Sequence, residues 1–284
     1  MQSPPDEPTR IRMEAAHSTA ATLMDLTCTG SPVWGFAGHT IGRQAGDRWL
    51  RVAASASASA RARRQGEGIV GAEALVPDDV PRPRLHGILD WTDGEHGYRA
   101  DLIDYITDPV VSSRPDLVTD PDIPDDWWRA LRTATEHLSA AETTKITVRD
   151  AWIRAAFPQY LGIPAPEKVE RVAGHGDYHW GNLTWPTLTI LDWERWGLVP
   201  VGFDPGMLHA NSLFVPAVAA RIRHEFAAVL NSPGGRIGEL VAIAEMLQAV
   251  ARGWYPELAV PLAGRARELT GITPPRDAAP ELVR

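Results

Sequence analysis

The sequence is poor in cysteine, and this scarcity excludes one class of protein. Cys28 is the only cysteine among 284 residues, so no disulfide can form within the chain, whereas small secreted domains commonly depend on several. The first residues, Met-Gln-Ser-Pro-Pro-Asp-Glu-Pro, also lack the basic and apolar regions of a signal peptide. We therefore expect a cytoplasmic protein that folds without disulfide bonds.

Long apolar runs and excess positive charge are missing as well. No stretch approaches the roughly 20 apolar residues of a membrane helix, so we expect no membrane partner. Acidic residues outnumber basic ones by 36 to 28, for a formal net charge of −8, whereas proteins that bind nucleic acids carry a basic surface. We expect no nucleic-acid partner, and the charge is compatible with a cationic small substrate. The composition gives no indication of the oligomeric state.

What the sequence does contain is a dense polar motif in its second half. Residues 175–183 read His-Gly-Asp-Tyr-His-Trp-Gly-Asn-Leu, and residues 190–194 read Ile-Leu-Asp-Trp-Glu. The two glycines in the first piece make a helix improbable. Residues 182–185 and 188–191 read as two short strands around a Pro-Thr turn. Such a hairpin would bring Asp192 back beside Asn182, close to Asp177.

These three side chains suit phosphoryl transfer. Mg²⁺ takes hard oxygen ligands, few of them from the protein and the rest from phosphates and water. Asn182 and Asp192 can supply the protein oxygens. Asp177 can accept a hydrogen bond from the hydroxyl that attacks the γ-phosphate, while positioning and charge neutralisation do most of the catalytic work.

The double motif resembles the signature of the aminoglycoside phosphotransferase and choline kinase-like family, which is related to the protein kinases. The kinase pattern His-Arg-Asp-x-x-x-x-Asn has the same spacing from Asp to Asn. The resemblance implies that Asp177 is the catalytic base and that Asn182 and Asp192 bind Mg²⁺. ATP or GTP would be the phosphate donor, and a hydroxyl of a small molecule would be the acceptor, with antibiotics among the candidates.

The resemblance also implies nucleotide-binding residues in the first half of the chain. Arg51, on an expected strand over residues 48–52, would contact the α- and β-phosphates, where protein kinases have lysine. A glutamate would hold it in place, and both Glu67 and Glu73 qualify; we favour Glu67. The glycine-rich stretch 34–42 is a candidate for a hairpin that covers phosphates, although such hairpins commonly bind nothing.

A further implied site lies at the end of an expected strand over residues 97–106. In kinase-like folds this segment links the two lobes, and its backbone bonds the adenine. The residues at that place are Ile103, Asp104 and Tyr105.

The fold that follows is α+β, a protein kinase-like arrangement of two lobes with the nucleotide between them. Residues 1–107 would form a small N-terminal lobe with an antiparallel sheet and one main helix; a further short helix is expected at residues 14–26. Residues 108–284 would form a larger, mostly helical C-terminal lobe. Asp204-Pro205 would open one of its helices, with Asp204 as the N-cap.

Two alternatives stay open at this point. A pseudokinase or scaffold that binds nucleotide without transfer is supported by Arg51 and by the irregular glycine pattern. A zinc metallohydrolase would use His175, Asp177, His179 and Asp192, but it leaves Asn182 without a role and has no further His motif nearby. We expect His175 to have a structural role. For His179, support of the loop and lining of the active site are equally open roles.

Overall fold

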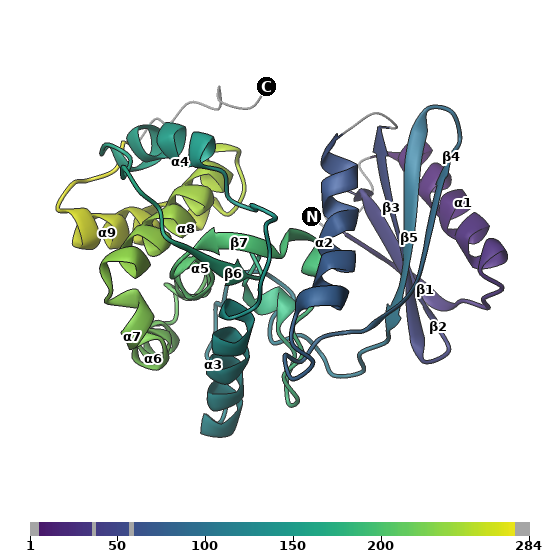
Figure 1. Cartoon of the computed structure of the whole chain (residues 1–284), viewed down its shortest axis with the longest axis horizontal. Coiled ribbons are helices and arrows are strands. Elements are labelled where there is room, and N and C mark those ends of the chain that lie inside the picture. The colour runs from purple at the N-terminus through teal and green to yellow at the C-terminus, as the bar shows by residue number, and fades with distance from the viewer. Residues whose placement is uncertain (1–5, 36–37, 57–59, 276–284) are drawn as a thin grey trace. The chain divides into compact units, whose positions relative to one another are not determined.

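The computed structural model describes residues 6–35, 38–56 and 60–275, and at residues 56 and 60–67 it describes the backbone alone. The chain divides into two compact units, Met1–Ala74 with Arg82–Thr107, and Leu75–Pro81 with Asp108–Arg284. The first contains an antiparallel sheet of five strands and the second is mainly helical (Figure 1). The predicted α+β class is confirmed.

The first unit is a sheet with two helices. Its elements are α1 (Glu7–Leu23), β1 (Thr29–Trp34), β2 (Thr40–Ala45), β3 (Arg48–Ala56), α2 (Ala60–Leu75), β4 (Leu85–Thr92) and β5 (His96–Asp104). The strands lie in the order β1-β2-β3-β5-β4, each antiparallel to its neighbour. Met13, Ala16 and Ala20 of α1 pack on Leu50 and on other buried residues of the strands. Figure 1 shows α2 across the sheet from α1.

Helix α1 starts earlier than the sequence predicted. We expected a helix from residue 14, but the helix begins at Glu7 because the Asp6 side chain accepts a hydrogen bond from the Thr9 amide at 2.8 Å. This is the usual way in which an aspartate caps a helix. The sequence-based prediction missed this cap because the first residues are rich in proline, which does not favour a helix.

The second unit gathers its helices around one apolar core and a short ribbon of two strands. Its elements are α3 (Asp125–Ser139), α4 (Asp150–Ala156), β6 (Arg171–Gly174), β7 (Gly197–Pro200), α5 (Phe203–Ala210), α6 (Pro216–Glu225), α7 (Ala227–Leu230), α8 (Pro233–Ala251) and α9 (Ala259–Thr270). Strands β6 and β7 pair antiparallel from Arg171↔Pro200 to Gly174↔Gly197. Ala242 and Ile243 of α8, together with Phe203 of α5, are completely buried in the core.

Glycines let α8 lie directly on the backbone that enters α5. A Cβ at Gly238 would stand 2.0 Å from the Val201 carbonyl oxygen, and a Cβ at Gly206 would stand 2.8 Å from the Cα of Glu239. This close packing fixes α5, whose first turn lies under the polar motif. In the part of the chain that the structure describes, no helix combines the length and the apolar character needed to cross a bilayer.

Candidate active site

The polar motif forms a loop between β6 and a small hairpin. A 3₁₀ turn, η3 (Trp180–Asn182), follows the loop. Leu183 and Ile190 then form an antiparallel bridge, and the Leu191 amide donates to the Asn182 carbonyl at 2.8 Å. The predicted hairpin is therefore present, but its strands are reduced to isolated bridges. Because Leu191 precedes Asp192, this pairing brings the two ends of the motif together.

Asp177 follows Gly176, which has the positive φ of 79° that favours glycine. A Cβ at Gly176 would stand 2.6 Å from the Arg195 carbonyl oxygen, so the loop passes directly over that segment. The Asp177 side chain is 32% exposed. Its carboxylate is thus within reach of a small molecule and supported from behind by the packed loop.

The electrostatic surroundings keep Asp177 ionised. Burial acts to raise the pKa of its carboxyl group, but His179 and the Arg195 guanidinium act in the opposite direction. The pKa therefore lies below its ordinary value. Arg195 is itself held by Glu245, with 2.5 Å between Nη1 and Oε1. At neutral pH the group is a carboxylate that can accept a hydrogen bond from a hydroxyl.

Asn182 is buried and its amide orientation is fixed by the loop. Its Nδ2 donates to the Asp177 carbonyl at 2.9 Å and lies 3.3 Å from His179 Nε2. The nitrogen side of the amide is therefore occupied by the loop. An amide oxygen held in this way suits a hard cation such as Mg²⁺.

Asp192 has an unusual backbone conformation. Its φ of 59° and ψ of 67° lie in the left-handed region, which is uncommon for a residue with a side chain. It precedes a 3₁₀ turn, η4 (Trp193–Arg195), and its side chain is exposed. Left-handed residues at such positions cluster at functional sites. Asn182 and Asp192 together offer the oxygen donors that Mg²⁺ prefers, so the residues present fit that ion.

Asp204 supports the loop from below. We expected it to be a helix N-cap, which was wrong: α5 begins at Phe203, and the Asp204 carboxylate points back to the loop. Its Oδ2 accepts from the His175 amide at 2.6 Å and its Oδ1 from the Gly176 amide at 3.0 Å. Burial raises the pKa of Asp204. Asp204 thus anchors the two residues that precede Asp177.

Buried tryptophans hold the other side of the loop. Trp180 stacks on Trp127 with ring centroids 6.2 Å apart and meets Trp128 edge-on at 5.8 Å. Its Nε1 donates to Ser212 Oγ at 2.8 Å. These rings fill the core beneath the loop. The sequence alone could not show which tryptophans would do so.

His175 has the structural role that the sequence predicted. Its Nε2 lies 2.7 Å from the Leu191 carbonyl oxygen, and its Nδ1 accepts from the Asp177 amide at 3.3 Å. Both ring nitrogens are engaged, which leaves none for a metal. Across the described ranges there is no group of three or more His, Cys, Asp or Glu side chains that could hold a metal ion. The zinc alternative therefore has no site here.

The first unit positions Arg51 on the predicted strand. Arg51 pairs in register with Asp101 of β5, and its Nη1 lies 3.7 Å from Asp101 Oδ2. Glu73 is engaged elsewhere, because it accepts from Arg84 Nε at 2.9 Å and from the Leu85 amide at 3.1 Å. Glu67 lies on α2, and its side chain is outside the described residues.

The segment that was expected to bond adenine ends β5. Ile103 pairs with Trp49, the Asp104 amide donates to the Arg84 carbonyl at 3.1 Å, and the Tyr105 amide donates to the Asp47 carbonyl at 3.0 Å. These two amides are used inside the sheet. A base contact through this segment would have to use carbonyl groups or residues beyond Tyr105.

The glycine-rich stretch 34–42 joins β1 to β2, which pair antiparallel. Residues 36 and 37 lie outside the described part of the chain. The side chain of Thr40 fills the space where a Cβ of Gly35 would lie, with Oγ1 1.9 Å from that position. The hairpin is present, and its phosphate-covering role stays a prediction.

Comparisons with known proteins bear on these assignments. Residues 109–238 match the model of the phosphotransferase enzyme family known as APH. This range includes the entire polar motif and Asp204. The resemblance that the motif indicated is thereby confirmed. The comparison with curated protein sequences gave no significant match.

Solved structures share the fold over nearly the whole chain. The aminoglycoside phosphotransferase APH(4)-Ia has a TM-score of 0.54 at 12% identity, covering 90% of this chain and 97% of its own. A GDP and kanamycin complex of APH(2")-IIia scores 0.56 at 13% identity, covering 90% and 98%. A choline/ethanolamine kinase family protein from Mesorhizobium loti scores 0.52 at 15% identity, covering 91% and 95%. The kinase-like fold is confirmed, and with the family match it supports an enzyme that phosphorylates a hydroxyl group of a small molecule.

Proposed function

We propose, on the premise that this chain is a kinase-like phosphotransferase, that it moves the γ-phosphate of ATP or GTP to a substrate hydroxyl accepted by Asp177. The observation that carries the proposal is the pairing of the Leu191 amide with the Asn182 carbonyl at 2.8 Å, which unites the two halves of the motif. This pairing supports the proposal, because Asn182 is in the paired segment, Asp192 directly follows it and Asp177 lies five residues before it.

The proposed roles follow from the surroundings of each side chain. The lowered pKa of Asp177 makes it a weak base, which suits a reaction whose transition state needs an oriented nucleophile more than early proton removal. Asn182 and Asp192 would hold Mg²⁺, which supplies charge neutralisation at the phosphates when it is bound. Asn182 also braces the Asp177 backbone. Arg51 is the proposed contact to the phosphates, since a guanidinium matches phosphate oxygens well.

The substrate class is proposed from chemistry and from the fold relatives. One relative was solved as a ternary complex with AMP-PNP and hygromycin B, another with GDP and kanamycin, and a third is an aminopropanol kinase. The net charge of −8 favours cationic ligands. Alcohols that also carry an amino group are therefore the first class to test, and antibiotics are one part of that class.

A substrate screen tests the proposal. Purified protein, Mg²⁺ and either ATP or GTP are incubated with hydroxyl-bearing antibiotics, amino alcohols and sugars, and nucleotide consumption is followed. We expect at least one compound to give substrate-dependent consumption and a phosphate monoester signal in ³¹P NMR. Thermal stabilisation by Mg·ATP with no product from any compound would favour the pseudokinase alternative instead.

A further inference from the structure

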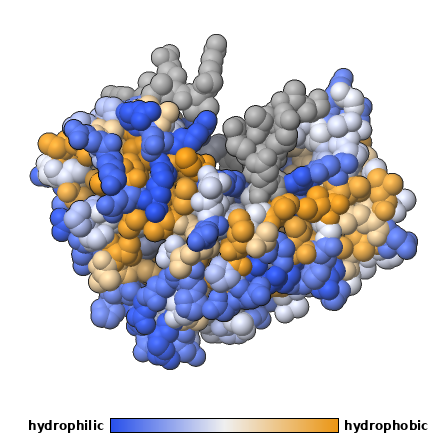
Figure 2. Space-filling model, in the orientation of Figure 1, coloured by the Kyte–Doolittle hydropathy of each residue, from blue (hydrophilic) through white to orange (hydrophobic). Residues whose placement is uncertain are grey.

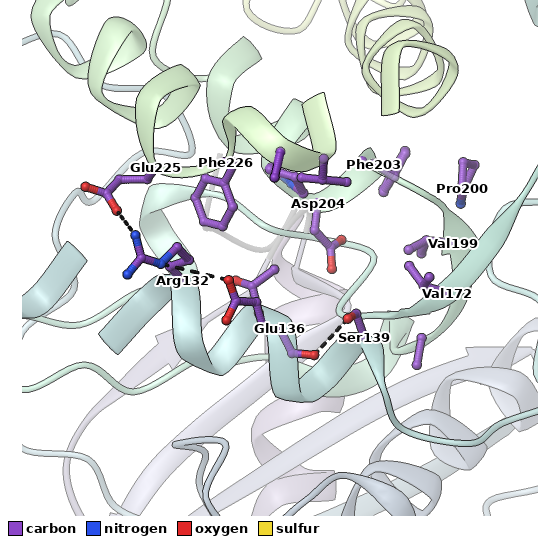
Figure 3. A pocket seen from close by; sticks show the side chains of 16 residues that line it. Arg132, Glu136, Ser139, Val172, Val199, Pro200, Phe203, Asp204, Glu225 and Phe226 are labelled. Atoms are coloured by element: carbon purple, nitrogen blue, oxygen red, sulfur yellow. Dashed lines mark hydrogen bonds and ion pairs between the residues drawn. The ribbon is translucent and has the colours of Figure 1, made fainter. Parts of the chain in front are cut away.

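A cavity lies in the C-terminal unit, separate from the proposed catalytic residues. Its volume is about 200 Å³, and its walls come from α3, β6, β7, the start of α5 and the α6–α7 segment (Figure 3). Asp177, Asn182 and Asp192 are not among the residues that line it. The proposed function therefore does not use this space.

The walls of this cavity are mainly apolar. Val172, Val199, Phe203 and Phe226 line it, as Figure 3 shows. A cavity of about 150 Å³ lined by such side chains is enough to hold benzene. The space thus suits one aromatic ring or a short branched aliphatic chain.

The charges at the cavity favour a cation. Three carboxylates line it, those of Asp204, Glu136 and Glu225, against one guanidinium, Arg132. Arg132 binds Glu225 at 3.2 Å and lies 3.9 Å from Glu136. Arg221, outside the lining, also binds Glu225 at 2.7 Å. Two guanidinium groups thus compensate Glu225, whereas Glu136 has Arg132 no nearer than 3.9 Å and is the carboxylate of the lining that suits a cation.

Two lining residues connect the cavity to the catalytic loop. Asp204 accepts the His175 and Gly176 amides with its two carboxylate oxygens, and it also lines the cavity (Figure 3). Thr135 Oγ1 lies 2.9 Å from the hydroxyl of Tyr178. The loop residues on both sides of Asp177 are therefore held by groups that a bound molecule would touch.

We propose that this cavity binds a small aromatic or branched-alkyl amine, with its apolar body against Val199 and Phe226 and its ammonium group toward Glu136. Occupancy repositions the catalytic loop through Asp204 and Thr135 and so changes the rate of phosphoryl transfer. The rate effect rests on the proposed function, whereas the binding does not.

Binding is tested with phenethylamine as the probe, beside the uncharged 2-phenylethanol and the anionic phenylacetate, by ligand-observed NMR titration. We expect the amine to bind at least threefold more tightly than the alcohol and the carboxylate to bind most weakly. Ala228 is exposed and lines the cavity, so Ala228→Trp should weaken amine binding at least tenfold. Ala220→Trp, at an exposed site outside the lining, is the matched control and should leave binding unchanged. Equal amine affinity in both variants, or no binding to the wild type, overturns the proposal.

The link to the loop is tested without relying on activity. Phenethylamine should shift the ¹H–¹⁵N signal of the Gly176 amide in the wild type and in Ala220→Trp, but not in Ala228→Trp. Binding without that shift overturns the coupling. With an identified substrate, kcat should change at least threefold under the same conditions. A protein that phosphorylates no compound but still binds the amine with the Gly176 shift would contradict the proposed function and support the amine site.

Discussion

At the scale of single residues, the motif acquires its chemistry from backbone pairing. Asp177 is placed by the positive φ of Gly176, Asn182 by its bond to the Asp177 carbonyl, and Asp192 by its own left-handed conformation. None of these placements depends on another functional side chain being charged. The side chains of Asp177 and Asp192 can therefore be replaced one at a time, whereas replacing Asn182 would also remove the bond that holds the Asp177 carbonyl.

Replacing Asp192 tests its proposed metal role. For Asp192→Ala we expect nucleotide binding in the presence of Mg²⁺ to weaken at least tenfold, because one of the few protein oxygens would be lost. Without Mg²⁺ the variant and the wild type should bind alike. Calorimetric titrations with and without the metal measure this, and Asp120→Ala, at another exposed aspartate, is the control. A variant that keeps the Mg²⁺-dependent part of binding would remove Asp192 from that role.

Glu239 carries a pH dependence of stability. It is completely buried, and it lies 3.2 Å from His209, 2.7 Å from Arg265 and 3.1 Å from Arg223. Burial acts to raise its pKa, but the neighbouring His209 and the Arg265 guanidinium outweigh burial and lower the pKa from 4.5 to about 2. A depressed carboxyl pKa stabilises the folded state above pH 4.5, by about 3 kcal/mol. This contribution is lost as the pH falls from 4.5 toward 2.

The variant Glu239→Gln tests the contribution of the Glu239 charge to stability. At pH 7 we expect it to be less stable than the wild type by about 3–5 kcal/mol, since the cations around it lose their partner. The difference in the free energy of unfolding should shrink as the pH falls from 5 to 3. Urea titrations at several pH values measure it, and a difference that stays constant over that range would contradict the assignment.

At the scale of elements, the packing of α8 on the entry of α5 decides how firmly the loop is supported. Gly238 allows α8 to approach the Val201 carbonyl and the Phe203 amide. Phe203 begins the helix that carries Asp204. We therefore expect a change on α8 to disturb Asp204, which anchors the loop of the polar motif.

Two glycine substitutions with opposite expected effects on stability test this packing. In Gly238→Ala the new Cβ would lie 2.0 Å from backbone oxygen, so we expect a loss of about 1–3 kcal/mol in stability. Gly264 lies in α9, and nothing stands within 4 Å of its Cβ position. Gly264→Ala should therefore gain about 0.5–1 kcal/mol. Thermal unfolding measures both, and an undisturbed Gly238→Ala protein would refute the close approach.

The elements also show what could be predicted from the sequence. The hairpin over residues 182–191 follows from local turn chemistry, and the two-part motif follows from spacing. The start of α1 depends on a local side-chain cap by Asp6, which the sequence-based prediction missed. The role of Asp204 depends on contacts with His175 and Gly176, which lie 29 and 28 positions earlier in the chain. Local patterns carry no signal for contacts of that range. For the same reason the sequence missed Asp101 as the partner of Arg51 and Trp127 as support for the loop.

At the scale of the whole molecule, the proposed function is supported by different evidence in the two units. The family match over residues 109–238 lies within the C-terminal unit, where it covers the motif and its anchor. The N-terminal unit lies outside that range, and its support is the likeness of the whole chain to solved structures at 12–15% identity. Its proposed nucleotide contact, Arg51, rests on position in that fold. The proposed function therefore depends most directly on the chemistry at Asp177.

The most direct measurement is phosphoryl transfer by Asp177→Asn to a substrate found in the screen, beside calorimetric binding of Mg²⁺ and nucleotide. The amide keeps the size of the side chain but removes the charge that accepts the hydroxyl proton, so we expect transfer to fall about 10²–10⁴-fold while nucleotide binding stays within a factor of three. Transfer at the wild-type rate by Asp177→Asn would contradict the account.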